Sequence, residues 1–303
     1  MALDADFLVD RRRLKRRLFL WRSLAIIAVI AAVAAAIGRF AGYTQSAYIA
    51  RLNVTGVIVD DGKRRKALDR IARDVNASAM IVHINSPGGT VVGGEALYQA
   101  IRNIAKRKPV VAVMGELATS AGYMVALAGN RIIARNGTIT GSIGVIMQTT
   151  EITGLLKNLG IKTEAVKSGP LKAAPSPLEP MTPEVRHVAQ ALVDDMFQMF
   201  VDMVARRRNI SRDAALALAD GRVYTGRLAL KKKLIDGIGG EGDAIEWLEK
   251  QSKISPGLPL RDMRIDRDVS EWIDYFGSMA RKAIFSERLT LDGLISVWHP
   301  DLR

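Results

Sequence analysis

The stretch "PVVAVMGELATSAGYMVALAGNRIIA", Pro109 to Ala134, contains two apolar runs separated by a turn of small residues around Ser120. The first run is short and rich in valine, which is typical of a buried strand, and the residues after the turn favour a helix. A chain that alternates strand and helix builds a parallel sheet covered by helices. The stretch therefore predicts an α/β fold with Ser120 at the carboxyl edge of the sheet, where open parallel sheets place their sites.

The same alternation continues on both sides of this stretch. We expect buried strands over residues 54–60, 79–86 and 131–135, and further alternation over residues 142–166. Helices are expected over residues 63–75, 91–107, 182–209 and 211–218, and Thr182 with Pro183 marks the start of the long one. No internal repeat is visible, although the pieces fit a repeated strand-strand-helix spiral.

The composition is that of an ordinary globular protein, with 49% hydrophobic and 25% charged residues in a chain of 303. The absence of cysteine excludes disulfides, a thiol nucleophile and a cysteine zinc site. The formal charge of +13 suggests an acidic partner. Neither an aromatic-basic platform nor a recognition-helix motif is visible, so we expect an anionic membrane rather than nucleic acid as that partner.

The N-terminal region has the pattern of a membrane anchor. Seven arginines and lysines within residues 11–22 precede residues 24–38, which carry no charge. We expect a basic cytoplasmic segment over residues 1–23, a transmembrane helix over 24–40 and a linker over 41–52, with the rest of the chain outside the cytoplasm. A cleaved signal peptide is the alternative, because small residues that suit cleavage end the apolar run.

Two further regions follow the linker. Residues 53–252 contain the alternating elements and form the expected main domain. Residues 253–303 are rich in aromatic side chains, and we interpret them as an extension that contacts the membrane or another subunit. The aromatic residues concerned are Trp272, Tyr275, Phe276, Phe285 and Trp298.

A second turn of interest is "INSPGGTV", Ile84 to Val91, which ends one expected strand and begins a helix. Free amides near Gly88 and Gly89 would point outward at the start of that helix and would suit a developing oxyanion. The alternative is a tight turn that needs glycine only for a positive φ.

Ser120 is either an N-cap or a nucleophile, and the second role needs a base. Of the three histidines, His83 falls inside a strand, His187 on the long helix and His299 near the C-terminus, so none lies in a turn. A lysine can replace histidine when apolar surroundings lower its pKa. Lys172 has apolar neighbours in the proline-broken loop "KSGPLKAAPSP", whereas the nearby lysines look like ordinary surface groups.

Five blocks in order carry a family resemblance: "INSPGG", "ELATSAGYMVALAGNRIIA", "TGSIGV", "KSGPLKAAPSP" and "DGRVYTGRLALKKKLIDGIGG". Across about residues 53–250 the chain resembles the signal peptide peptidase A family, membrane-bound serine-lysine peptidases of bacteria. The resemblance implies the fold shared by Clp protease and the crotonases, a spiral of strand-strand-helix units.

The resemblance also assigns roles to particular residues. Ser120 would be the nucleophile, Lys172 the general base, and Ser142 would orient the lysine amine, although Ser142 could also be a turn serine between two glycines. The oxyanion amides implied are those of Gly88, Gly89 and Ala121.

The expected activity is that of a membrane-anchored serine endopeptidase that needs no cofactor or metal. The resemblance implies hydrophobic peptides such as signal peptide remnants as substrates, and a catalytic domain on the periplasmic face of a bacterial inner membrane. Double-length relatives hold the lysine and serine in different halves, so this chain is expected to form a homo-oligomer with shared active sites. The alternatives are an inactive scaffold of the same fold and a crotonase-type acyl-CoA enzyme.

Overall fold

The structure, a computed structural model, describes residues 17–33, 46–251, 254–265 and 294–297. The chain divides into two units, residues 1–46 and 47–303. In the first unit, residues 17–33 form a helix. Among the described residues, no helix combines the length and the apolar character needed to cross a bilayer. The anchor expected over residues 24–40 lies partly outside the described residues, and so does most of the expected C-terminal extension.

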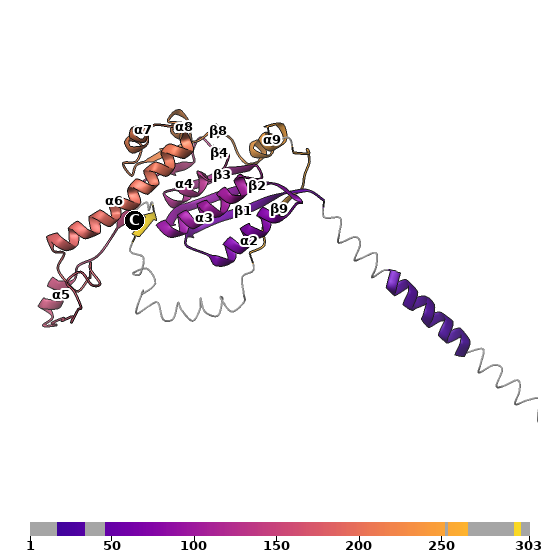
Figure 1. Cartoon of the computed structure of the whole chain (residues 1–303), viewed down its shortest axis with the longest axis horizontal. Coiled ribbons are helices and arrows are strands. Elements are labelled where there is room, and N and C mark those ends of the chain that lie inside the picture. Colours follow the sequence, from indigo (N-terminus) through magenta and orange to yellow (C-terminus); the bar gives the residue numbers. More distant parts are fainter. Residues whose placement is uncertain (1–16, 34–45, 252–253, 266–293, 298–303) are drawn as a thin grey trace, which may run out of the picture. The chain divides into compact units, whose positions relative to one another are not determined.

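The second unit is built on one sheet, shown in Figure 1. Its central strands run in the order β6-β10-β2-β3-β4-β8, with β1 beside β2 and β9, and β5 beside β3 and β7. The strands are β1 Tyr48–Ile58, β2 Ala77–Thr90, β3 Val110–Thr119, β4 Arg131–Ala134, β5 Ile139–Gly141, β6 Ile146–Met147, β7 Val223–Thr225, β8 Gly237–Ile238, β9 Leu260–Asp262 and β10 Leu294–Val297. Strands β1, β2, β3, β4 and β8 pair in parallel, whereas β10 is antiparallel to both of its neighbours.

This unit has helices on both faces of the sheet, and all but α5 contribute side chains to the two cores beside it. The helices are α2 Gly62–Arg73, α3 Val91–Ala105, α4 Ala121–Ala126, α5 Thr153–Asn158, α6 Pro183–Arg208, α7 Arg212–Ala217, α8 Gly226–Lys231 and α9 Glu241–Gln251. The larger core lies between the sheet and α2, α3, α4 and the second half of α6, and a smaller one lies under α9. Alternate residues of β1, β2, β3 and β4 face the two cores, as a pleated strand requires. The expected α/β class is therefore confirmed, while the finer spiral stays a prediction.

Three expectations about single elements need correction. The strand expected over residues 54–60 is β1, which begins at Tyr48 because it pairs with both Ala77 of β2 and, one residue later, Leu260 of β9. Residues 162–166, expected to continue the alternation, form neither strand nor helix and are exposed. Residues 142–148 contribute only the two-residue strand β6.

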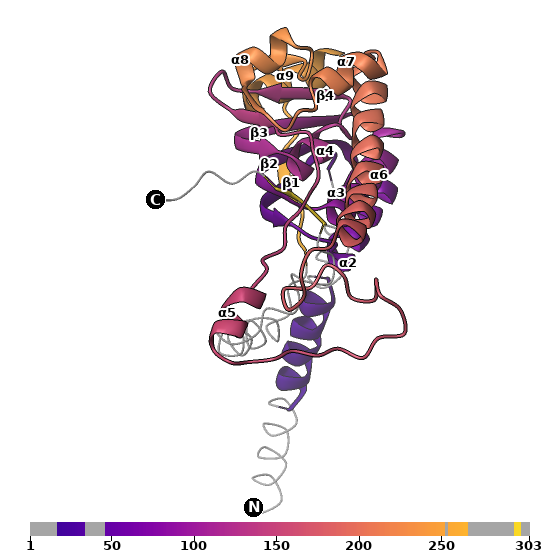
Figure 2. The ribbon, with the colours of Figure 1, turned by 90° about the vertical axis from the view of Figure 1, so that its left-hand side faces the viewer.

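We call residues 148–182 the arm, since this segment, which includes α5, extends away from the sheet in both views (Figures 1 and 2). Large apolar side chains on the arm are exposed, and Leu155, Leu159 and Val166 are 59%, 65% and 100% accessible. Helix α6 connects the arm to the core: its second half is buried around Phe200, whereas Val188 in its first half is half exposed. The arm therefore presents apolar side chains that the described part of the chain leaves exposed.

Candidate active site

Ser120 lies at the turn between β3 and α4, and its backbone is strained. It has φ of 57° and ψ of −119°, a region that residues with a side chain rarely occupy. Such a conformation costs about 1–3 kcal/mol and persists only where the surrounding structure imposes it. Ser120 occupies the N-cap position of α4, but its side chain makes no capping hydrogen bond. A capping role therefore does not explain this serine.

Hydrogen bonds to neighbouring segments hold the Ser120 turn in place. The amide of Ser120 donates to the carbonyl oxygen of Gly141 over 2.8 Å. One residue earlier, the hydroxyl of Thr119 donates to the carbonyl oxygen of Pro87 over 3.0 Å. These bonds join the end of β3 to β5 on one side and to the glycine turn of β2 on the other. The residue is only 1% accessible in this chain, so its position is fixed by packing as well.

Ser142 comes directly after the strand that accepts the Ser120 amide. Since the carbonyl oxygen of Gly141 bonds to Ser120, the structure brings the two predicted serines side by side. Ser142 also has a positive φ, 49°, is 8% accessible, and donates its amide to the carbonyl oxygen of Arg222. Two strained, buried serines at adjacent strand ends are consistent with a site that orients hydroxyl groups.

The turn expected at residues 87–89 needs correction, because β2 continues through these residues to Thr90, with register shifts against β1 and β3. We keep the name glycine turn for residues 87–89, and a serine that the sequence analysis did not single out organises them. The hydroxyl of Ser86 donates to the carbonyl oxygen of Gly56 over 2.6 Å and accepts the amide of Gly88 over 3.1 Å. Gly88 has a φ of 120°, and a Cβ on Gly89 would lie 1.8 Å from the carbonyl oxygen of Ile58. The backbone conformation of Gly88 and the close packing at Gly89 thus explain why both positions are glycine. The amide of Gly88 already donates to the Ser86 hydroxyl. The sequence feature that could have identified Ser86 is its position at the end of an expected buried strand.

Helix α4 places the remaining oxyanion candidate. Ala121 is its first residue, is buried, and directly follows Ser120. The first amides of a helix have no acceptor within the helix, so this amide can be directed at a ligand. The helix is held against the core by Tyr123, whose buried hydroxyl donates to the carbonyl oxygen of Leu234 over 2.9 Å. Complete burial raises the pKa of Tyr123 strongly, so this anchor stays protonated.

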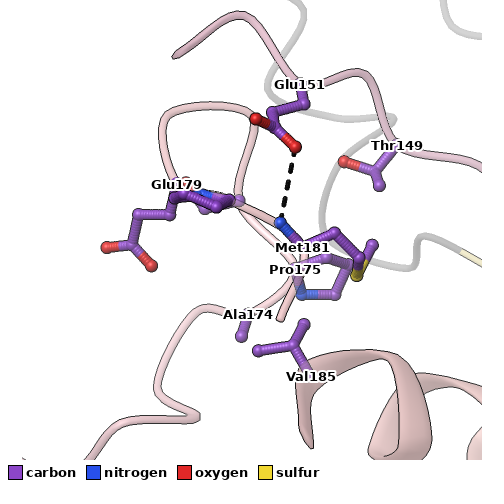
Figure 3. Close-up of a pocket in the computed structure, with 9 residues that line it drawn as sticks. Thr149, Glu151, Ala174, Pro175, Glu179, Met181 and Val185 are labelled. Atoms are coloured by element: carbon purple, nitrogen blue, oxygen red, sulfur yellow. Dashed lines mark hydrogen bonds between the residues drawn. The ribbon is translucent and has the colours of Figure 1, made fainter. Parts of the chain in front are cut away.

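Lys172 lies on the arm, and the structure does not bring it to Ser120 within one chain. Its side chain is exposed, and its ammonium group makes no hydrogen bond within the part of the chain that the structure describes. The next residue, Ala173, has a positive φ of 61°. Figure 3 shows how the loop continues: Pro175 lies in a small pocket beside Val185, where the Met181 amide donates to the carboxylate of Glu151. The loop around Lys172 therefore has local contacts that hold its backbone, but Lys172 itself is exposed.

The two histidines that the structure describes lie away from the Ser120 turn or are exposed. His83 pairs with Val113, which is seven residues before Ser120, and at about 3.3 Å per strand residue this places His83 about 23 Å from Ser120. It lines a polar pocket of about 320 Å³ with Arg51 and Glu241, at the start of α9. His187 is exposed on α6, and His299 lies outside the described residues.

Comparisons with known proteins identify the family of the chain. Residues 102–255 match the family model for peptidase family S49, a range that holds Ser120, Ser142 and Lys172. The chain is 37% identical over 210 residues to slr0021 of Synechocystis, a presumed protease, covering 69% of this chain and 76% of that one. Protease 4 of Haemophilus influenzae is 31% identical over 238 residues, which is 75% of this chain and 38% of the relative.

Among solved structures, the chain is similar to a mutant of the 1510-N membrane-bound stomatin-specific protease. The TM-score is 0.47 at 17% identity, and the match covers 73% of this chain and 99% of that one. The family model is decisive, since it covers half of the chain, from the end of α3 through α9, and the identity to slr0021 extends over 69% of the chain. The chain therefore belongs to peptidase family S49, which confirms the resemblance to signal peptide peptidase A that its sequence motifs indicate.

Proposed function

We propose that the chain is a serine endopeptidase in which Ser120 is the nucleophile and Lys172 the general base. The observation that carries this proposal is the strained, buried Ser120 turn, whose hydroxyl does not cap the helix behind it. A sharp strand-to-helix turn holds the backbone of a nucleophile in a fixed position at the edge of the sheet. Membership of a peptidase family supports the reaction class.

The proposed chemistry uses backbone and side-chain groups only. A neutral Lys172 amine removes the proton of the Ser120 hydroxyl, whose oxygen attacks the carbonyl carbon of the substrate peptide. The amide of Ala121 and an amide of the glycine turn stabilise the negative charge on the carbonyl oxygen. The lysine then donates its proton to the leaving amine, and water hydrolyses the acyl-enzyme. Ser142 accepts or donates a hydrogen bond that directs the lysine amine.

Lys172 is proposed to act on Ser120 of a second copy of the chain. Its exposure on the arm and the uncovered apolar residues around it support this arrangement, because an interface there would bury both. A lysine that acts as a base must be shielded from water, since burial disfavours its charged form. An isologous or ring-forming contact through the arm would provide that shield.

Membrane attachment and substrate class belong to the same proposal. The uncharged run over residues 24–38, which follows the basic segment in the sequence, is the basis for proposing a membrane anchor. An anchored peptidase would meet hydrophobic peptides left in the bilayer after signal peptide cleavage, on the outer face of a bacterial inner membrane.

The test uses full-length protein in detergent and a fluorogenic hydrophobic peptide. Ser120→Ala and Lys172→Ala should each lower kcat/KM by about 10⁴-fold or more. Lys157→Ala and Lys162→Ala, which change exposed lysines of the same arm, serve as matched controls and should keep the wild-type rate.

Mixing the two inactive variants decides whether the site is shared. If subunits exchange freely, about a quarter of the sites combine an intact Ser120 with an intact Lys172, and about a quarter of the activity returns. No recovery after verified exchange would place both residues in one chain. A Lys172→Ala protein at the rate of the lysine controls would exclude Lys172 as the base.

A further inference from the structure

The amino-terminal edge of the sheet carries a cluster of basic side chains. Helices α2 and α3 lie side by side on one face, and each ends just before the strand that follows it, β2 or β3 (Figure 1). Because β1, β2 and β3 are parallel, both helix ends lie at the edge where these strands begin. We call the cations of the two helix ends the basic edge: Arg70, Arg73, Arg102, Lys106, Arg107 and Lys108.

The charge at this edge is unbalanced. Within residues 69–76 and 102–108 the six cations are accompanied by two carboxylates, Asp69 and Asp74, which leaves a net charge of +4. The carboxylate of Asp74 is already engaged, because it accepts the Tyr48 hydroxyl over 2.6 Å. The basic edge therefore attracts anions, and its own acidic groups do not neutralise it.

Three of these cations have no structural role within the described residues. Helix ends attract basic side chains because the last carbonyl groups of a helix carry partial negative charge. Lys108 and Arg102 serve that role, since each donates to a backbone carbonyl oxygen of a neighbouring segment. By contrast, the side chains of Arg73, Lys106 and Arg107 are exposed and make no hydrogen bond or ion pair with the residues that the structure describes.

An apolar side chain lies within the basic edge. Val75 is in the turn between α2 and β2, two residues after Arg73, and is 91% accessible. The Asp74 side chain accepts the Asn76 amide over 2.9 Å, so the turn that exposes Val75 is held by its own hydrogen bond. Apolar side chains that enter the headgroup region and cations that pair with anionic lipids are the two contributions to binding at a membrane surface.

The position of the basic edge also fits a bilayer. β1 begins at Tyr48 at this same edge, so the chain enters its second unit there. In the sequence, the uncharged run on which the anchor proposal rests precedes this entry point. The Ser120 turn lies at the opposite, carboxyl end of β3, so contact at the basic edge leaves the candidate active site uncovered.

We propose that the basic edge docks the domain on anionic phospholipid headgroups. Arg73, Lys106 and Arg107 pair with the phosphates, and Val75 enters the headgroup region. The inference rests on the membrane attachment proposed above and adds a second contact, made by the folded domain itself. Since β3 contains 10 residues at about 3.3 Å each, docking holds Ser120 about 30 Å from the headgroups, and a peptide must leave the bilayer by that distance to be cleaved.

The first test uses the absence of cysteine in the chain. Full-length Val75→Cys protein carries a single environment-sensitive fluorophore and is placed in nanodiscs of phosphatidylcholine, with or without about 30% phosphatidylglycerol. We expect quenching by doxyl-labelled lipid only in the anionic discs, and its loss at about 1 M salt, where the Debye length falls to about 3 Å. Equal quenching in neutral discs, or none in anionic discs, would overturn the inference.

Charge variants of the labelled protein test the side chains. Arg73→Gln/Lys106→Gln/Arg107→Gln should lower the ratio of docked to undocked protein about 100-fold in anionic discs, since each cation near the surface contributes about fivefold. The matched control removes the same charge from exposed side chains at α8, through glutamine at Arg227, Lys231 and Lys232. It should leave the quenching unchanged, and an equal loss in both triple variants would contradict a docking site at the basic edge.

The result is separate from that of the proposed function, because neither readout requires hydrolysis. A protein that cleaves peptide but shows no quenching retains the proposed function and loses this inference. A protein that does not incorporate into discs refutes the anchor, and its flotation with vesicles of the two compositions then decides whether the basic edge binds anionic lipid. A fluorophore change that depends on protein concentration and not on lipid would place the basic edge between copies of the chain and overturn the inference.

Discussion

The turn that carries Ser120 and the arm that carries Lys172 belong to one chain but differ in almost every physical respect. Ser120 is 1% accessible, strained in φ, and hydrogen-bonded through its backbone to a neighbouring strand. Lys172 is exposed, in a segment whose large apolar residues face outward. A peptidase needs both groups in one place. In the proposed mechanism the nucleophile is therefore positioned within a single chain, whereas the base is shielded from water only where a second copy covers the arm.

The two regions also differ in how much they contribute to the stability of the fold. The core can hold a strained serine because parallel strands pack on both sides of it and the fold as a whole bears the cost. The arm contributes little burial to its own chain, so its sequence is under fewer packing constraints there. Four predictions, from the largest expected effect to the smallest, test this contrast between the Ser120 turn and the arm.

The first compares glycines of the two regions. Gly89→Ala should destabilise the protein by more than about 4 kcal/mol, because the added Cβ would lie 1.8 Å from a backbone oxygen of β1. Gly154→Ala in α5 meets no atom within 4 Å and should be neutral or stabilise by up to about 1 kcal/mol. Thermal unfolding followed by circular dichroism measures both, and a stable Gly89→Ala protein would show that β1 and β2 can separate here.

The second compares serines. Ser142→Ala should lower kcat by about 100-fold, or about 2.7 kcal/mol, because it removes the hydroxyl that directs the base. Its thermal midpoint should change by less than about 2 °C, because the backbone hydrogen bond from the Ser142 amide to the Arg222 carbonyl oxygen remains in the variant. Ser168→Ala, the same change on the arm, should leave kcat unaltered. A Ser142→Ala enzyme as fast as the Ser168→Ala control would assign Ser142 a turn role only.

The third concerns strain itself. Ser120→Gly should abolish activity yet stabilise the fold by about 1 kcal/mol, because glycine adopts φ of 57° without the steric cost. Ser168→Gly on the arm should not raise the free energy of unfolding. The two changes are compared by differential scanning calorimetry, and a Ser120→Gly protein that melts below wild type would mean that the turn is not strained.

The fourth compares a hydrogen bond at the edge of the core with an ion pair of the arm. The Tyr48 hydroxyl donates to Asp74, which lowers the pKa of that carboxyl, while burial and then the hydrogen bond to Asp74 raise the pKa of Tyr48 to about 12. Tyr48→Phe should cost about 1 kcal/mol at pH 7. Loss of the arm's Lys167–Glu179 pair in Lys167→Ala should cost less than about 0.5 kcal/mol.

The pH dependence of that difference has a definite sign. A carboxyl whose folded pKa is lowered contributes stability that is full above its unfolded pKa, near 4, and is lost as the pH falls through the folded value. The gap between wild type and Tyr48→Phe should therefore shrink below about pH 4, as urea titrations would record. A gap that stays constant down to pH 2.5 would contradict the assigned bond.

Much of the fold could be predicted from local patterns. Apolar runs around Val111 and Ile81 indicated buried parallel strands, and Thr182 with Pro183 marked the first turn of α6. The start of β1 at Tyr48 could not be predicted, because its pairing partner Leu260 is more than 200 residues away. Likewise, the role of Ser86 depends on a contact with Gly56, which no local pattern reveals.

The sequence by itself determined the α/β class, the family and the serines at the strand ends, because hydrophobic periodicity and small-residue turns are local signals. Only the tertiary structure decided that Ser120 and Ser142 lie side by side, that Lys172 stays apart from them, and that β10 lies along the glycine turn. These are relations between segments distant in sequence, and they are set by strand pairing and packing over the whole sheet.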